Sequence, residues 1–151
     1  SGVEADTVRA IQRELAQRGY EPGTADGRVG MVTRAAIMAY EADYGLPLTA
    51  EPSDALLRHI ILASVTRPAP NSLPAPKATT AAAEQLLRTV QQSLSSLGYF
   101  TARVDGRPGE AIARAIREYE MDQRMAQTGR VSAQLLTRLA QTVADGRKAQ
   151  R

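Results

Sequence analysis

The sequence GYEPGTADGRVG occupies residues 19–30, and the similar sequence GYFTARVDGRPG occupies residues 98–109. Both contain Asp-Gly-Arg followed by a further glycine at the same spacing. Asp before Gly favours a tight turn, because the carboxylate accepts nearby backbone N–H groups and glycine takes positive φ without steric cost. Each stretch therefore predicts a glycine-containing bend between two elements of regular structure.

The similarity extends outward from the two bends. Residues 8–60 align with residues 87–139 without a gap. Since an internal repeat of this length fixes the domain plan, the chain is expected to contain one folded unit twice. Identical pairs include Gln12 and Gln91, Leu15 and Leu94, Tyr40 and Tyr119, Thr49 and Thr128, and Ser53 and Ser132.

A proline-rich segment, residues 67–83, separates the copies. It holds Pro68, Pro70, Pro74 and Pro76, half of the eight prolines in the chain. Proline at alternating positions cannot continue a helix, so we expect an extended, solvated Pro/Ala-rich linker. The expected organisation is a first domain at 1–66, the linker at 67–83, a second domain at 84–146 and a disordered tail at 147–151.

Each copy has three apolar stripes with helical spacing rather than the alternation of strands. The sequence therefore predicts an all-α protein with two small three-helix bundles in tandem, which we expect to unfold independently. The stripes are Val8, Ile11 and Leu15, then Thr33, Ala36, Ile37, Tyr40 and Tyr44, then Leu56, Leu57 and Ile60 in the first copy, and Leu87, Val90, Leu94 and Leu97, then Ile112, Ala115, Ile116 and Tyr119, then Leu135, Leu136, Leu139 and Val143 in the second. The predicted N-caps are Asp6, Thr80, Ser53 and Ser132, and the predicted left-handed C-terminal caps are Gly19 and Gly98.

Composition argues against several kinds of chemistry. The chain has no cysteine, which excludes disulfides, thiolate metal ligands and a cysteine nucleophile. Its only histidine, His59, has Arg138 at the equivalent repeat position and is expected at the surface or cap region of its helix. Because a domain of about 60 residues leaves little structure for a deep catalytic cleft, we expect no catalytic residue, metal site or cofactor.

Charge and hydropathy narrow the range of partners. The net charge is +3, which suits an acidic polymer, although a coding bias toward Arg and Ala explains it equally well. Arg and Asp/Glu are interleaved, so we expect no nucleic-acid binding. No apolar run approaches the roughly 18 residues of a membrane span, so any membrane anchor is expected outside this segment.

The ordered motifs resemble the bacterial peptidoglycan-binding-like domain, a three-helix module often joined to cell-wall hydrolases. The first copy matches its pattern at Gln12, Leu15, Gly19-Tyr20, Asp26-Gly27-Arg28-Val29-Gly30, Thr33, Ala36, Tyr40, Gly45-Leu46 and Thr49, and the second at Gln91, Leu94, Gly98-Tyr99, Asp105-Gly106-Arg107-Pro108-Gly109, Ala115, Tyr119 and Thr128-Gly129. Both copies have Tyr-Glu where the family usually has an aromatic residue before Gln, and Arg124-Met125 replaces Gly45-Leu46 in the second copy.

The resemblance implies a non-catalytic module that binds peptidoglycan, through a glycan strand or a stem peptide, in the periplasm or cell envelope. It also implies that the segment is the targeting part of a larger or membrane-anchored protein. The altered Tyr-Glu pairs leave an alternative open, in which the module kept the fold, lost saccharide binding and docks other envelope proteins.

Eight residues are candidate ligand contacts, and each also has a structural interpretation. Guanidinium groups beside the bends suit stem-peptide carboxylates, but a solvated loop arginine, or one that pairs with a local carboxylate, is the more common case. Tyrosine rings suit sugar faces, although those on the apolar stripe of the second helix are more typical of a core. The aspartates are better explained by turn formation than by acid–base chemistry, which needs a second carboxylate across a cleft. The candidates are Tyr20, Asp26, Arg28, Tyr40, Tyr99, Asp105, Arg107 and Tyr119.

Overall fold

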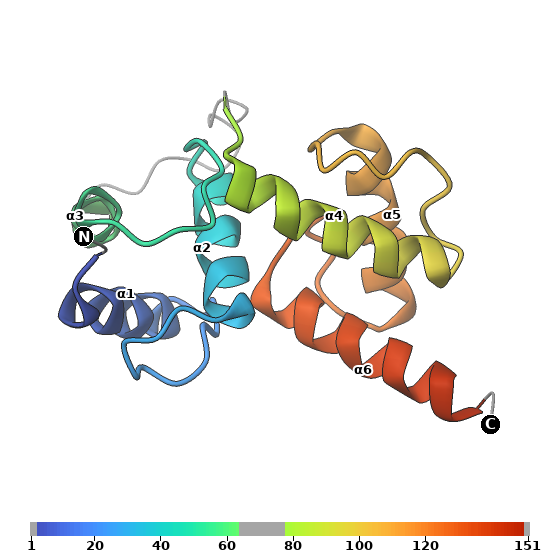
Figure 1. Ribbon diagram of the computed structural model, residues 1–151, viewed down its shortest axis with the longest axis horizontal. Coiled ribbons are helices and arrows are strands. Elements are labelled where there is room, and N and C mark those ends of the chain that lie inside the picture. The colour runs from blue at the N-terminus through green and yellow to red at the C-terminus, as the bar shows by residue number, and fades with distance from the viewer. Residues whose placement is uncertain (1–2, 64–77, 150–151) are drawn as a thin grey trace.

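The computed structural model describes residues 3–63 and 78–149, and this part of the chain contains six α-helices and a single isolated β-bridge (Figure 1). The all-α prediction and the pair of three-helix units are thereby confirmed. In Figure 1 the first three helices fill one half of the molecule and the last three the other, with α2 at the centre. The helices are α1 (Ala5–Gln17), α2 (Met31–Asp43), α3 (Asp54–Ala63), α4 (Ala81–Ser96), α5 (Glu110–Asp122) and α6 (Ala133–Ala149).

The boundaries of the regular structure differ from the expected ones at two places. Most of the predicted linker, 67–83, lies outside the described residues, but α4 begins within it at Ala81. At the other end, α6 continues to Ala149, inside the segment 147–151 that we expected to be a disordered tail.

Local capping explains where several helices begin. The Thr80 hydroxyl accepts a hydrogen bond from the Ala83 N–H, and those of Ser53 and Ser132 cap α3 and α6 in the same way. These caps were predicted correctly. The prediction for Asp6 was wrong: α1 begins at Ala5 after Glu4, so Asp6 lies inside the first turn and pairs with Arg9 instead.

The glycines that end α1 and α4 have the expected left-handed conformation. Gly19 has φ of +85° and Gly98 has φ of +90°. Both follow the last helical turn at equivalent positions, where a residue with a Cβ atom would be strained.

A buried glutamine in each copy fixes the bend to the first helix of that copy. The side-chain oxygen of Gln12 accepts a hydrogen bond from the Gly27 N–H at 3.0 Å, and that of Gln91 accepts one from Gly106 at 2.8 Å. Because these amides are buried and satisfied, they position the bend as part of the fold.

The two copies pack against each other rather than hanging apart. α2 contacts both α4 and α6 in addition to α1. Its residues Ala35 and Met38 belong to the hydrophobic core of the second copy, and Ala133 of α6 belongs to that of the first. The sequence left the contact between the copies open, and the structure supplies it.

Main-chain hydrogen bonds also join the entrance of α4 to the first copy. The Leu48 N–H donates to the Ala78 carbonyl at 2.9 Å, and the Thr80 N–H donates to the Leu48 carbonyl at 2.9 Å. They form a parallel bridge between Leu48 and Thr79. The start of the second copy is therefore held directly on the first.

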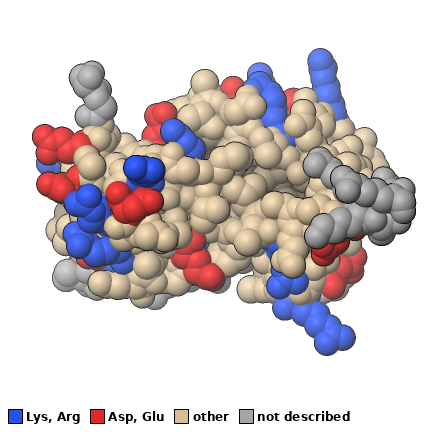
Figure 2. All heavy atoms as spheres, turned by 60° about the horizontal axis from the view of Figure 1, so that its bottom comes forward, with Lys and Arg blue, Asp and Glu red and all other residues tan. Residues whose placement is uncertain are grey.

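The face of the molecule drawn in Figure 2 shows no separation of charge. Figure 2 shows Lys and Arg scattered among Asp and Glu over the visible face, as the interleaved sequence predicts. Within residues 3–63 and 78–149, no helix is long and apolar enough to cross a membrane.

Candidate functional site

Tyr40 and Tyr119 lie in the two cores with no exposed surface. The Tyr40 hydroxyl forms a hydrogen bond with His59 Nδ1 at 2.7 Å, and the Tyr119 hydroxyl forms one with Thr142 Oγ1 at 2.6 Å. As placed here they present no ring face to solvent, and contact of either ring with a ligand stays a prediction. His59 is half-buried rather than on the open surface, because it packs edge-on against Tyr40 and Tyr44.

Tyr20 and Tyr99 lie over these buried rings and form a second equivalent pair. Their rings meet those of Tyr40 and Tyr119 edge-on, with centroids 5.7 and 5.4 Å apart. Each is half-buried and donates its hydroxyl hydrogen to an aspartate. The acceptors are Asp43 and Asp122.

The environments of these phenols raise their pKa values. Burial, followed by the hydrogen bond to Asp43, raises the pKa of Tyr20 above its ordinary value. The hydrogen bond to Asp122, followed by burial, raises the pKa of Tyr99 to about 12. Both phenols are therefore neutral hydrogen-bond donors near neutral pH.

The aspartates and arginines of the bends are exposed side chains. Asp26 accepts a hydrogen bond from the Arg28 N–H, and Asp105 accepts one from Arg107, both at 2.9 Å. These backbone hydrogen bonds are the main reason that the pKa values of both aspartates are lowered. Turn formation is thus confirmed for the two aspartates. In the described part of the chain, the guanidinium groups of Arg28 and Arg107 have no hydrogen-bonding partner.

The departure from aromatic-Gln to Tyr-Glu has a structural explanation. The buried Glu41 carboxylate accepts hydrogen bonds from the N–H and hydroxyl of Thr49 and from the N–H of Ala50. Glu120 makes the same set with Thr128 and Gly129. Burial raises the pKa of Glu41, and the hydrogen bonds from Thr49 and Ala50 oppose that shift.

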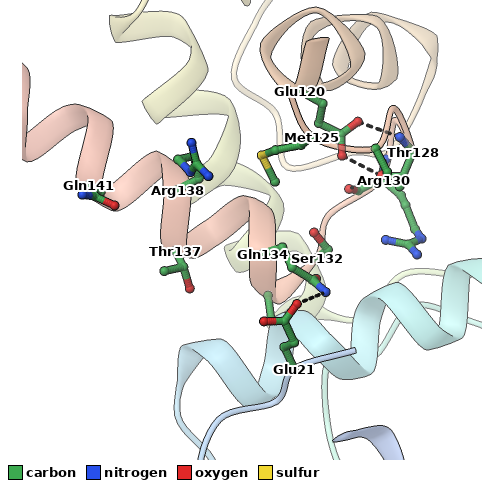
Figure 3. A pocket seen from close by; sticks show the side chains of 12 residues that line it. Glu21, Glu120, Met125, Thr128, Arg130, Ser132, Gln134, Thr137, Arg138 and Gln141 are labelled. Carbon is green, nitrogen blue, oxygen red and sulfur yellow. Dashed lines mark hydrogen bonds between the residues drawn. The ribbon is translucent and has the colours of Figure 1, made fainter. Parts of the chain in front are cut away.

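A pocket of about 630 Å³ lies beside α6 in the second copy and reaches the first copy at Glu21 (Figure 3). One wall is the face of α6 and another is the loop from Met125 to Ser132. Figure 3 shows Glu21 beside the start of α6, next to Gln134, and Arg138 farther along the same helix. The polar side chains of its α6 wall are Gln134, Thr137, Arg138 and Gln141.

Part of the pocket lining is already committed to holding the structure together. Arg130 is turned toward the first copy, where it pairs with Asp43. Glu120 is occupied by the donors of its own loop. Thr137 and Gln141, both exposed, make no side-chain hydrogen bond within the described residues, so they are available to a ligand.

One contact joins the two copies beside the pocket. The Gln134 side-chain nitrogen donates to the Glu21 carboxylate at 2.7 Å and to the Gly19 carbonyl at 2.9 Å. Glu21 has φ of +53°, which is unusual for a residue with a Cβ atom. A strained residue at the rim of a pocket is consistent with a functional constraint there.

The pocket was missed by the sequence reasoning, which searched for what the copies share. Its main charged residues are those that differ between copies: Glu21 corresponds to Phe100, and Arg138 corresponds to His59. Comparing the charges of equivalent residues in the two copies would have singled out Glu21 and Arg138 from the sequence. Among residues 3–63 and 78–149, no cluster of His, Asp or Glu could hold a metal ion.

Comparison with known proteins gives one family. Residues 4–60 and 84–139 each match the family model described as "Putative peptidoglycan binding domain". No curated protein and no solved structure matches the chain. The two matches cover more than half of the sequence and coincide with the two helical units. The chain therefore belongs to this family of peptidoglycan binding domains and contains two tandem copies of the domain.

Proposed function

We propose that the chain is a non-catalytic cell-wall binding module that holds a bacterial envelope protein on peptidoglycan. Membership of a binding-domain family supports the polymer as ligand. The pocket beside α6 is the observation that carries the proposal for where a ligand binds. In this proposal the module works in the periplasm or cell envelope as the targeting part of a larger or membrane-anchored protein.

The dimensions and lining of the pocket suit a fragment of that polymer. Ligand pockets commonly enclose about 300 to 1,000 Å³, and this one measures about 630 Å³. The hydroxyl of Thr137 and the amide of Gln141 supply donors and acceptors for sugar hydroxyls or peptide groups. Their exposure allows a strand much longer than the pocket to pass across it.

The bends offer a rival contact in each copy. Arg28 and Arg107 are exposed at equivalent positions, so both could reach stem-peptide carboxylates. Tyr20, Tyr99, Asp26 and Asp105 lie in the same segments and belong to this version of the site. The two versions make different predictions for variants.

Co-sedimentation with insoluble peptidoglycan at low salt tests the proposal. Wild type is expected in the pellet, because even modest affinity retains protein on a polymer with many sites. The pocket double variant Thr137→Val, Gln141→Ala should bind several-fold more weakly, since each change removes a polar group that meets the ligand. The bend double variant Arg28→Ala, Arg107→Ala is the comparison and should sediment like wild type.

Two results would contradict parts of the proposal. Wild type found entirely in the supernatant would exclude peptidoglycan as the ligand. Loss of binding in the bend variant together with normal binding in the pocket variant would move the site to the bends.

The Tyr-Glu pairs no longer support the alternative of a protein-docking module. It rested on the replacement of Gln by Glu after the aromatic residue. Because Glu41 and Glu120 hold the adjacent loops, these replacements serve the fold and say nothing about a lost ligand.

A further inference from the structure

We infer that the pocket takes a zwitterionic peptide, whose carboxylate meets Arg138 of the second copy and whose ammonium group meets Glu21 of the first. The inference rests on the proposed function and names the part of the polymer that is recognised, a stem peptide rather than the glycan alone. Its consequence is that the ligand bridges the two copies.

Arg138 supplies the positive charge for the ligand. Its guanidinium is exposed on α6 and donates to the Gln123 side-chain oxygen at 3.1 Å. A guanidinium has five N–H donors, so this bond leaves a pair available for bidentate contact with a carboxylate. At the equivalent place in the first copy, His59 is packed against Tyr40 and Tyr44 and offers no such group.

Glu21 supplies the negative charge. Gln134 donates to its Oε2 atom, and no donor reaches its Oε1 atom from the described residues. The same Gln134 amide nitrogen contacts the Gly19 carbonyl, which holds this segment against α6. The equivalent residue Phe100 is buried in the second copy, so the carboxylate is specific to this side of the pocket.

The other charged groups of the pocket do not compete for the ligand. The Arg130 guanidinium is held by both oxygens of Asp43, and the Glu120 carboxylate is held by Thr128 and Gly129. One cation, Arg138, and one anion, Glu21, are therefore left in the pocket lining (Figure 3). Such an arrangement favours a ligand with both charges and disfavours one with a single charge.

The docking of the copies is then part of recognition. Only the docked arrangement brings Glu21 to α6, so a ligand that contacts Glu21 and Arg138 together stabilises it. Asp43 lies outside the pocket lining and acts as a positioning residue through Arg130.

Calorimetric titration with a purified muropeptide that carries a free amine and a free terminal carboxylate tests the inference. The same muropeptide with its amine acetylated, or with its carboxylate amidated, removes one charge without changing the protein. We expect each modification to weaken binding to wild type about two- to fivefold, the range of a solvent-exposed ion pair.

Variants then assign each charge to its partner. Glu21→Gln should weaken binding of the unmodified muropeptide and leave the acetylated form unaffected, because the charge it meets is already gone. Arg138→Gln should behave in the same way toward the amidated form. Glu118→Gln and Arg114→Gln, exposed charges on α5, alter the net charge equally and should leave both affinities unchanged.

The outcomes separate this inference from the proposed function. Equal affinity for all three muropeptides, with wild type still sedimenting on intact peptidoglycan, would overturn the zwitterionic ligand and leave the wall-binding role standing. Absence of both muropeptide binding and sedimentation would remove the two together. If the α5 control variants changed the affinity by a similar amount, the effect would reflect the net charge of the protein. That result would overturn the assignment of Glu21 and Arg138 as ligand contacts.

Discussion

The Arg130 guanidinium donates two hydrogen bonds to the Asp43 carboxylate, from Nε to Oδ1 at 2.6 Å and from Nη2 to Oδ2 at 3.0 Å, across the boundary between the copies. The Tyr20 hydroxyl donates to the same carboxylate, and the guanidinium carbon lies 5.9 Å from the centre of the Tyr20 ring. In the second copy Tyr99 donates to Asp122, but no arginine pairs with that aspartate within the described residues. Asp122 is therefore an internal control for the contact between Asp43 and Arg130.

Asp43→Asn should lower the free energy of unfolding by about 1 kcal/mol, because a bidentate charged contact is lost at a site that is still about a third open to water. Asp122→Asn removes a carboxylate whose one side-chain hydrogen bond among the described residues is with Tyr99, and it should cost under about 0.5 kcal/mol. Urea unfolding measures both. Equal losses in the two variants would show that the arginine contact adds nothing.

The contact between the copies predicts one cooperative unfolding transition, in place of the two independent ones expected from the sequence. Ala35 and Met38 of α2 are buried by the second copy, so separation exposes apolar surface. A fragment that lacks residues 67–151 should melt at a lower temperature than the whole chain. Two calorimetric transitions, with the fragment matching one of them, would restore the independent model.

The sequence predicted what each copy does by itself and missed what the copies do together. Caps, bends and stripes depend on near neighbours, so the residues at Thr80 and Ser53 were sufficient to place them. The contact between the copies could have been predicted from α2. Its six consecutive residues Ala35–Tyr40 are all buried, so every side of the helix is covered. A helix that is apolar all round packs against more than one partner, whereas the equivalent run in α5 contains Arg114, Arg117 and Glu118.

Glu41→Gln should change how stability depends on pH. Burial raises the pKa of Glu41 in the folded protein, so the stability it contributes is present below its unfolded pKa and is lost as pH rises through the folded value. Glutamine does not titrate and can still accept from Thr49 and Ala50. The variant should therefore gain stability relative to wild type as pH rises above the unfolded pKa of a glutamate, about 4.3, as measured by urea unfolding at each pH. A constant difference as pH rises would contradict the shift.

Arg124→Gly should stabilise the protein. Arg124 has φ of +59°, a left-handed conformation, and its counterpart in the first copy is Gly45, with φ of +66°. Relief of the strain, about 1 to 2 kcal/mol, exceeds the extra unfolded-state entropy of glycine, so a net gain of about 0.5 to 1 kcal/mol is expected. Gly45→Ala is the reverse test and should destabilise. A stabilised Gly45→Ala would show that the loop relaxes.

Because α6 docks on the α2 face of the preceding unit, the geometry of this pair is head-to-tail and could in principle be repeated indefinitely. In the second unit the equivalent face of α5 bears Arg114, Arg117 and Met121 where the first unit has Ala35, Met38 and Ala42. Two long cations in place of small or apolar contacts make this face of α5 a poor docking surface for another copy of α6. The same substitutions oppose head-to-tail polymerisation between chains.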